Sequence, residues 1–146
     1  MRARKESRLD AEGRGLLAYQ AALDRKANDI VILDLRKIST ITDLFLLCTG
    51  QNARQMQAIA EAIDERLSEC GVEPLSREGT GEGTWILLDY DDLVVHVFSE
   101  EARKFYNLER LWARARRLTN LAGETIVDRT EKTRLNPATS RTGSAQ

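Results

Sequence analysis

The sequence predicts an α/β domain in which a mixed sheet of about five strands is flanked by helices. Short apolar runs rich in β-branched residues are typical of buried strands, and two longer segments repeat apolar residues every three or four positions, as helices do. Two strand-like runs are separated by only two residues, which favours an antiparallel hairpin. The 146 residues are enough for one core and too few for two.

The N-terminal part of this domain supplies one helix and two strands. Residues 10–27 have apolar residues at helical spacing, with Asp10 as the N-cap. The core face of this helix is predicted to carry Leu16, Tyr19, Leu23 and Ala27. The run 29–35 (D-I-V-I-L-D-L) predicts a strand buried on both faces. After a polar connection, 44–50 (L-F-L-L-C-T-G) predicts a second strand.

A second helix begins after Asn52, which is a good N-cap and has Gln55 three residues further on, as in a capping box. It ends at Gly71, where a left-handed residue is favoured. The apolar stripe is formed by Met56, Ile59, Ala60, Ile63 and Leu67. The piece E-P-L-S-R then predicts a short edge strand, because proline is confined to sheet edges. A loop with Gly79, Gly81 and Gly83 follows.

The predicted hairpin pairs T-W-I-L-L-D-Y with L-V-V-H-V-F around Asp91 and Asp92. Ser99 then caps a short helix, and a second short helix, L-E-R-L-W-A-R-A-R-R-L, covers 108–118. We therefore expect a folded domain at residues 10–118. Residues 1–9 are expected to be a frayed N-terminus, and residues 119–146 a polar, disordered tail.

The composition argues against several classes of protein. A net charge of −1 argues against nucleic-acid binding as the main function of the whole chain, because phosphate binding usually needs a basic excess. Two cysteines do not make a disulfide framework. No segment approaches the roughly 20 apolar residues that span a bilayer, and the N-terminus has no apolar run typical of a secretory signal. A cytoplasmic protein without membrane contact is expected.

Enzymatic chemistry has one candidate, the carboxylates of Asp89 and Asp91. Carboxylates two apart on a strand share a face and can hold Mg²⁺ for nucleotidyl transfer. A role in the hairpin turn is favoured instead, since Asp is common in turns and Thr49-Gly50-Gln51 is a poor phosphate cradle. His96, the only histidine, is interpreted as a hydrogen-bonded structural residue. We expect no catalytic residue, no metal site and no cofactor.

A docking surface is the better hypothesis. Trp85 and Tyr90 bracket the first hairpin strand, and aromatic residues are common in interface hot spots. Acidic residues surround them, namely Glu82, Asp89, Asp91 and Asp92. An aromatic patch rimmed by carboxylates suits a basic protein partner. Trp112 is interpreted as a core residue. The basic cluster Arg114, Arg116 and Arg117, with Arg129, Lys132, Arg134 and Arg141 in the tail, suits either RNA phosphates or solvent at a helix end.

Three separated motifs resemble the ribosomal silencing factor family, RsfS, also called the Iojap family. They are D-I-V-I-L-D-L-R-K-I-S-T-I-T-D-L-F-L-L-C-T-G, W-I-L-L-D-Y-D-D-L-V-V-H-V-F and E-E-A-R-K-F-Y-N-L-E-R-L-W. The resemblance covers about Gly15 to Leu118. It departs from the family's pattern at Asp91, where glycine is usual and would favour a tight turn, and at Ser99, where histidine is common.

The resemblance implies a nucleotidyltransferase-like fold without the transferase's catalytic set. It implies docking on the large ribosomal subunit against the L-series ribosomal protein number fourteen. Subunit joining is then blocked sterically and translation falls when nutrients are scarce. Homodimers are a second implied partner. By motif position, the docking role falls on Trp85, Leu88, Asp89, Tyr90 and Asp92, and the charge and aromatic pattern adds Glu82, Asp91 and Tyr106. The alternative is a Mg²⁺-dependent nucleotidyltransferase-like enzyme that uses Asp89 and Asp91.

Overall fold

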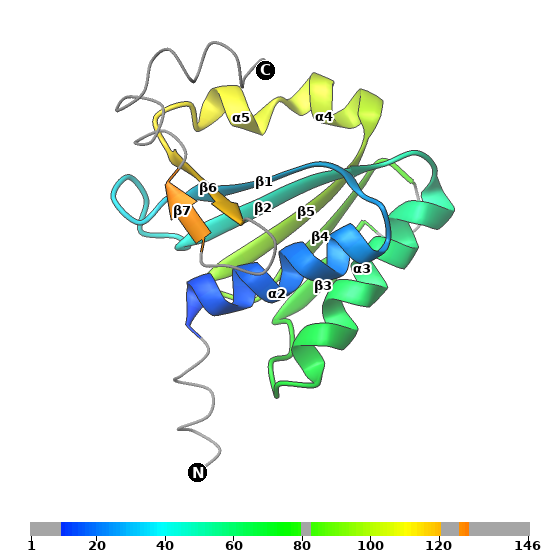
Figure 1. Ribbon diagram of the computed structural model, residues 1–146. Coiled ribbons are helices and arrows are strands. Elements are labelled where there is room, and N and C mark those ends of the chain that lie inside the picture. Colours follow the sequence, from blue (N-terminus) through cyan, green and yellow to red (C-terminus); the bar gives the residue numbers. More distant parts are fainter. Residues whose placement is uncertain (1–9, 80–82, 121–125, 129–146) are drawn as a thin grey trace.

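A mixed sheet of seven strands runs through the centre of the computed structural model, which describes residues 10–79, 83–120 and 126–128 (Figure 1). Its strand order is β3-β4-β5-β2-β1-β6-β7. The strands are β1 (Asn28–Asp34), β2 (Leu44–Gly50), β3 (Ser76–Glu78), β4 (Trp85–Asp89), β5 (Leu93–Ser99), β6 (Arg116–Asn120) and β7 (Ile126–Asp128). Only β2 and β5 pair in parallel. The predicted mixed α/β fold is confirmed, with two strands more than expected.

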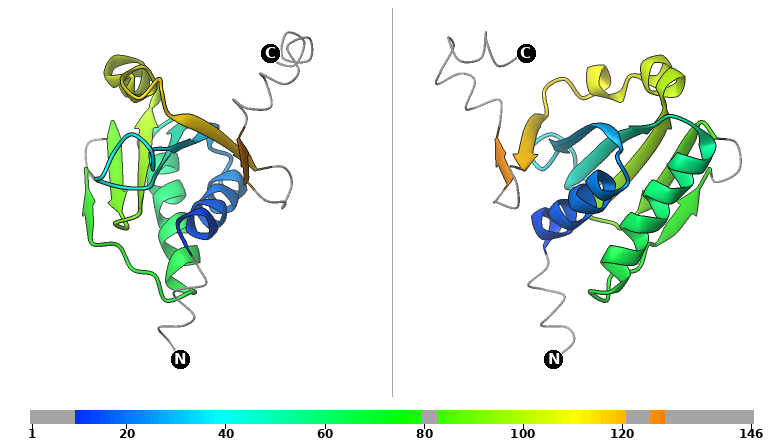
Figure 2. Two further views of the ribbon diagram at one scale, coloured as in Figure 1. Left: turned by 90° about the vertical axis from the view of Figure 1, so that its left-hand side faces the viewer. Right: turned by 45° about the vertical axis from the view of Figure 1, so that its right-hand side comes forward.

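Helices cover the sheet unequally on its two faces. The helices α2 (Ala11–Asp24) and α3 (Ala53–Ser68) pack on one face, and α4 (Glu100–Tyr106) and α5 (Leu108–Leu111) lie on the other (Figure 2). The larger apolar cluster lies under α2 and α3, and the smaller one lies under α4 and α5. Among the helices that the structure describes, none is long and apolar enough to cross a bilayer.

The small residues of α2, rather than the predicted large ones, face the core. Its buried residues are Ala11, Gly15, Ala18, Ala21 and Ala22, whereas Leu23 is exposed. A Cβ added at Gly15 would lie 3.3 Å from Leu44 Cδ1, so α2 lies close against the sheet. Of the predicted stripe, Tyr19 and Ala27 are partly buried against the core, whereas the closest contacts with the sheet are made by small residues that the apolar spacing did not single out. The N-cap is confirmed, since Asp10 Oδ1 accepts from the Gly13 N–H at 2.9 Å.

The prediction for α3 is confirmed in detail. Asn52 Oδ1 accepts from the Gln55 N–H at 2.8 Å, and all five residues of the predicted stripe are buried. Gly71 has a φ of +82°, the left-handed backbone expected after the helix. The 16-residue length and the 3.6-residue period of this helix made its core face readable from sequence alone.

The segment after α5 differs from the prediction. The helix expected over 108–118 ends at Leu111, and Arg116–Asn120 forms β6, which pairs antiparallel with β1. The last strand, β7, falls in the range expected to be a polar tail. The reason is tertiary, because β1 otherwise presents a free edge and Leu118 is buried opposite Ile32. The predicted basic residues Arg129, Lys132, Arg134 and Arg141 lie outside the described residues.

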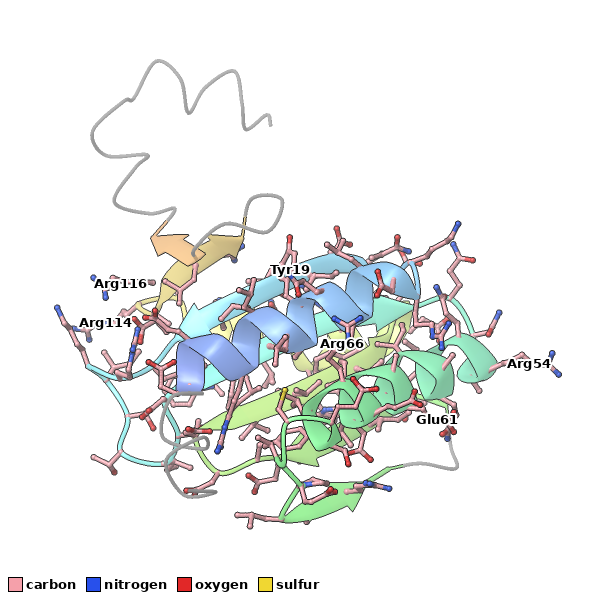
Figure 3. The ribbon with its side chains drawn as sticks, turned by 60° about the horizontal axis from the view of Figure 1, so that its bottom comes forward. Tyr19, Arg54, Glu61, Arg66, Arg114 and Arg116 are labelled. Carbon is pink, nitrogen blue, oxygen red and sulfur yellow. The ribbon has the colours of Figure 1, made fainter. Side chains whose placement is uncertain are left out.

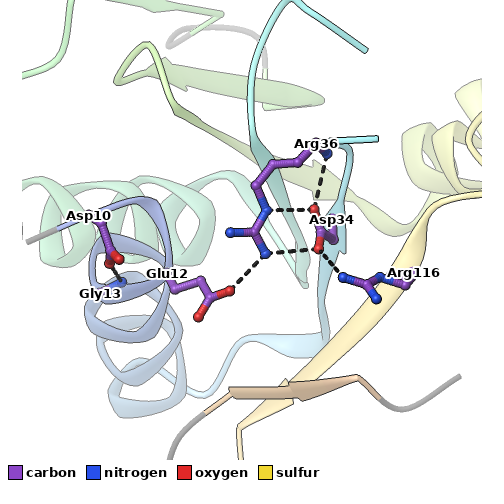
Figure 4. A network of polar contacts seen from close by, with 6 residues as sticks. All are labelled: Asp10, Glu12, Gly13, Asp34, Arg36 and Arg116. Carbon is purple, nitrogen blue, oxygen red and sulfur yellow. Dashed lines mark hydrogen bonds and ion pairs between the residues drawn. The ribbon is translucent and has the colours of Figure 1, made fainter. Parts of the chain in front are cut away.

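An ion-pair network at the end of β1 attaches β6 and α2 to the sheet (Figure 4). The buried Asp34 carboxylate binds Arg36 through two contacts of 2.9 and 2.8 Å, and it binds Arg116 of β6 at 3.1 Å. Arg36 also binds Glu12 of α2 at 2.7 Å. The hydrogen bonds from Arg36 hold the pKa of the Asp34 carboxyl well below its usual range, so Asp34 is charged at neutral pH.

Asp34→Asn should lower the free energy of unfolding by about 2 kcal/mol, because the change leaves two guanidinium groups without their shared carboxylate. Both arginines keep partial access to water, which limits the loss. Urea unfolding at pH 7 measures the effect. The matched control is Asp24→Asn, whose partner Arg66 lies at the surface and whose loss should cost under about 0.5 kcal/mol. Equal losses in the two variants would contradict the central role of Asp34.

Candidate functional site

Three aromatic residues form a surface patch where β4 begins and α4 ends. The rings of Trp85 and Tyr106 lie 4.5 Å apart between centroids, and Phe105 contacts Tyr106 edge-on at 5.0 Å. Phe105 is 80% exposed and Tyr106 is 48% exposed, whereas Trp85 is half-buried. We call Trp85, Phe105 and Tyr106 the aromatic patch. The structure thus brings together two residues of the predicted docking set that are 21 positions apart in the sequence.

The side-chain period of β4 decides which of its residues reach this surface. Trp85 and Asp89 alternate with Ile86 and Leu88, which point to the face covered by α2 and α3. Phe98 lies beneath Trp85, with a centroid distance of 4.9 Å. The patch therefore rests on a buried aromatic base rather than on a loop.

An arginine holds α4 over the sheet and so fixes the patch. Arg103 Nη1 donates to the Asp29 carbonyl at 2.7 Å and to the Thr49 hydroxyl at 2.9 Å. Its Nε and Nη2 bind the Glu109 carboxylate at 3.2 and 2.9 Å. These hydrogen bonds from Arg103 lower the pKa of Glu109. One side chain thus ties α4 to α5 and to the strands beneath them, which positions Phe105 and Tyr106.

His96 supports the patch from inside the sheet. Trp85 Nε1 donates to His96 Nδ1 at 3.1 Å, so the neutral ring carries its proton on Nε2. Among the described residues His96 Nε2 has no hydrogen-bond partner, and its ring contacts Phe45 at 4.5 Å. Burial lowers the pKa of His96 to about 3. The structural role predicted for this histidine is confirmed by its hydrogen bond and burial.

Two residues of the predicted docking set lie in the core instead of at the surface. Leu88 and Tyr90 are each 2% exposed and belong to the cluster under α2 and α3. The Tyr90 hydroxyl donates to Asp64 Oδ1 at 3.1 Å. Burial, and then the Asp64 charge, raise the pKa of Tyr90. A partner that binds the folded chain therefore does not reach these two side chains, which shape the surface only from below.

The acidic residues cluster at the other end of β4, in the hairpin turn. Asp89 Oδ1 accepts from the Asp91 N–H at 2.8 Å, and Asp91 adopts a φ of +78°. Asp92 binds Arg14 of α2 at 2.9 Å. Asp91 is exposed, whereas Asp89 and Asp92 are half-buried. The remaining predicted acidic residue, Glu82, lies outside the described residues.

The predicted turn role of the carboxylate pair is thus seen directly, and the groups expected of a phosphate cradle have other partners. The Thr49 hydroxyl binds Arg103, and a Cβ added at Gly50 would lie 2.6 Å from Met56 Cγ. Gly50 is therefore explained by close packing of β2 against α3. Within the described residues no three His, Cys, Asp or Glu side chains gather as a metal site would require. Burial raises the pKa of Cys48 to about 12, so its thiol is no nucleophile at neutral pH.

Sequence reasoning missed the exposed apolar residues of the two short helices. Phe105 and Leu111 are 80% and 71% exposed. A signal was present in E-E-A-R-K-F-Y, because adjacent Phe and Tyr residues of a helix cannot both face the core. Only Ala102 of α4 is buried, so this helix keeps most of its apolar surface outside.

Comparison with known proteins identifies the family to which this arrangement belongs. The family model described as ribosomal silencing factor during starvation, RsfS, matches residues 10–146. The chain belongs to the ribosomal silencing factor family. Its resemblance to this family, inferred from three motifs, is thereby confirmed.

Relatives in the silencing factor family span bacteria and plants. The ribosomal silencing factor RsfS of Bacillus subtilis is 43% identical over 99 residues, which cover 68% of this chain and 84% of that protein. The chloroplastic protein Iojap of Zea mays is 33% identical over 99 residues, which cover 66% of this chain and 42% of that protein. The bacterial relatives are named as ribosomal silencing factors.

Solved structures support the fold. A crystal structure of a protein from Chromobacterium violaceum has a TM-score of 0.69 at 35% identity, and it covers 71% of this chain and 87% of that one. A crystal structure from Bacillus halodurans has a TM-score of 0.61 at 42% identity, and it covers 66% of this chain and 90% of that one. Both solved structures thus share the fold of this chain over most of its described residues.

The neutral His96 predicts a loss of stability in mild acid. The unfolded chain takes up a proton near the ordinary pKa of 6.5, whereas the folded chain does so only near pH 3, so stability falls as pH drops below 6.5. The expected slope is about 1 kcal/mol per pH unit between pH 6.5 and 5.5. Asp34 and Glu109 contribute little in this window, because the ordinary pKa values of 3.8 and 4.5 place proton uptake by their unfolded carboxyl groups mainly below pH 5.5.

Urea unfolding at half-unit pH steps measures this slope. His96→Gln cannot titrate and should give a pH-independent free energy of unfolding over the same window, whatever its absolute stability. A slope that survives in this variant would show that another group causes it.

Asp91→Gly should raise the free energy of unfolding by about 0.5–1 kcal/mol, because glycine takes positive φ without the steric cost of a Cβ. The turn's hydrogen bond from the residue-91 N–H to Asp89 is kept, since it uses the backbone donor. Thermal and urea unfolding measure the gain. Asp91→Ala is the control and should lower stability. A loss in the glycine variant would show that the Asp91 side chain itself stabilises the turn.

Proposed function

We propose that this chain binds the large ribosomal subunit through its L-series ribosomal protein number fourteen and thereby blocks association with the small subunit. Membership of the silencing factor family supports this proposal. The observation that carries the docking surface is the aromatic patch, in which Phe105 is 80% exposed beside Tyr106 and Trp85. No catalytic step is required, and translation is repressed by occupancy alone.

Charge and shape suit a basic protein partner. The aromatic patch offers apolar area of the kind that forms interface hot spots. Asp89 lies on the same face of β4 as Trp85, and Asp91 is exposed at the turn beyond it. Carboxylates at one end of an apolar strip favour a partner with matching cations and guide its approach. Ribosomal proteins, which contact RNA, carry such cations.

The proposed mechanism is steric. A folded domain bound where the two subunits meet occupies volume that an intersubunit bridge needs, so joining requires that the factor dissociate. The rigidity of the site matters because a surface held in place by Arg103 and Phe98 loses little conformational entropy on binding. The proposal places the chain in the cytoplasm, where it would act on free large subunits.

Two further partners belong to the same proposal. Self-association would use the exposed apolar side chains of α4 and α5, since a symmetric pair buries Phe105 and Leu111 from each copy. A smaller contact with ribosomal RNA would use the basic segment that follows α5. Dimer formation through this patch would compete with docking on the ribosome.

Sedimentation with separated ribosomal subunits tests the proposal. The chain should travel with the large subunit and reduce the yield of whole ribosomes when small subunits are added. A chain that stays at the top of the gradient would overturn the proposal. Small-subunit binding alone would overturn it as well.

Phe105→Ala combined with Leu111→Ala should weaken large-subunit binding at least about tenfold, because both apolar side chains are lost from an interface rather than from the core. The free energy of unfolding should change little. The control is Leu23→Ala, a 51% exposed apolar residue of α2 on the opposite face of the sheet (Figure 2), which should bind as the unsubstituted chain does. Equal weakening by the control would remove α4 and α5 from the interface.

A further inference from the structure

A groove lies between the loop that joins β1 to β2 and the residue that follows α5. It has a volume of about 500 Å³ and is lined by loop residues 36–41 and by Trp112. Trp112 was predicted to be a core residue, yet it is only half-buried and forms one wall of this groove. Its ring packs edge-on against Phe45 at 5.9 Å, which fixes its position.

The two segments that meet here are basic. Residues 35–42 and 110–117 contain six arginines and lysines and no acidic residue, although the whole chain has a net charge of −1. Arg36 pairs with Asp34 and Glu12, Arg116 pairs with Asp34, and Arg117 lies 3.9 Å from the Glu109 carboxylate. These ion pairs remove part of the local charge.

The remaining cations are Lys37, Arg110 and Arg114. All three are exposed, and within the part of the chain that the structure describes their side chains have no ion-pair partner. Figure 3 shows Arg114 and Arg116 at the end of the sheet opposite to Arg54. The structure therefore divides the arginine cluster predicted from sequence into a paired part and an unpaired part.

We infer that this groove, which we call the basic groove, binds single-stranded RNA, with Lys37, Arg110 and Arg114 on phosphates and Trp112 against a base. Exposed cations beside an accessible aromatic ring are the two elements of sequence-tolerant RNA binding. An RNA backbone suits this surface better than an acidic peptide would, because phosphates repeat regularly along the strand. Each of the three cations, which come from two segments, can then bind one phosphate. The inference deepens the proposed docking on a ribosomal subunit and rests on it.

The basic groove also corrects the identity of the RNA-contacting residues. Lys37 and Trp112 line the groove, whereas Arg110 and Arg114 lie on the segment to either side of Trp112 and flank it. Arg116 is assigned to the sheet through Asp34. The RNA contact and the aromatic patch are thus separate surfaces on the same face of the sheet.

Fluorescence titration of a labelled 12-nucleotide oligouridylate tests the inference at several salt concentrations. Lys37→Gln combined with Arg114→Gln should weaken binding about tenfold at low salt. It should also reduce the slope of log affinity against log salt by about 1.4, which is 0.7 for each lost phosphate contact on a single strand. The control combines Arg25→Gln with Arg54→Gln and should change affinity less than twofold. Both cations are exposed, Figure 3 shows Arg54 far from Arg114, and the Arg25 carbonyl accepts from Gln55 next to Arg54 at 3.1 Å. Equal loss in both pairs would overturn the inference.

Tryptophan fluorescence tests whether a base contacts Trp112. The chain has two tryptophans, so Trp85→Phe leaves Trp112 as the only one. Its fluorescence should be quenched by the oligouridylate, as a base stacks on the ring. Binding without quenching would overturn the role of Trp112. Quenching by a 12-residue polyglutamate but not by the oligouridylate would overturn RNA in favour of an acidic protein segment.

Free RNA separates this inference from the proposed function. Phe105→Ala should impair large-subunit binding and leave oligouridylate affinity unchanged, because Phe105 lies outside the groove. If the chain fails to sediment with large subunits yet binds the oligouridylate at the groove, the docking proposal fails alone. If it sediments with large subunits but shows no groove-dependent RNA affinity, the RNA inference fails alone.

Discussion

The parallel pairing of β2 with β5 is the constraint on which the rest of the structure depends. Seven residue pairs run in register from Leu44 opposite Leu93 to Gly50 opposite Ser99. Parallel strands need a long crossover connection, and this pair sits in the middle of the sheet. Both faces of β2 and β5 are therefore buried, so a layer of helices is required on each side. β1 and β4 then pair antiparallel at the flanks, which sets the position of every loop described above.

The two layers are unequal, and the thin one carries the candidate surfaces. α2 and α3 have 14 and 16 residues, whereas α4 and α5 have only 7 and 4. The short helices leave aromatic side chains half-covered. Neighbouring rings follow one another across this face from Tyr106 through Trp85, His96 and Phe45 to Trp112, with centroid distances of 4.5, 5.8, 4.5 and 5.9 Å. The aromatic patch and the basic groove are the two ends of this row.

Long, strongly periodic elements were predictable, and contacts between distant segments were not. The stripe of α3 and the hairpin of β4 and β5 follow from local patterns. β6 was predicted as a helix because local patterns do not reveal its partner, the free edge of β1, which lies some 80 residues earlier. The ion pair between Asp34 and Arg116 likewise leaves no signal in the sequence. At the site, the hairpin pattern placed Trp85 at the start of a strand, whereas Tyr90 beyond the strand end could be assigned to the core only once α3 was seen beside it.

The near-neutral charge of the chain conceals an acidic and a basic surface. The acidic turn joins β4 to β5 and the basic loop 36–41 joins β1 to β2, and both lie at the same end of the sheet, where the Leu44 N–H donates to the Asp92 carbonyl at 3.0 Å. The net charge of the whole chain argues against RNA binding, but that argument holds only if the charged residues are spread evenly over the protein surface. Ion pairs within the chain reduce the charge that each surface presents to a partner. Asp34 pairs with Arg36 and Arg116, and Arg14 pairs with Asp92. Few unpaired charged residues remain exposed on each surface. This fits one protein contact and one RNA contact on a mixed protein–RNA surface better than strong binding to protein or RNA alone.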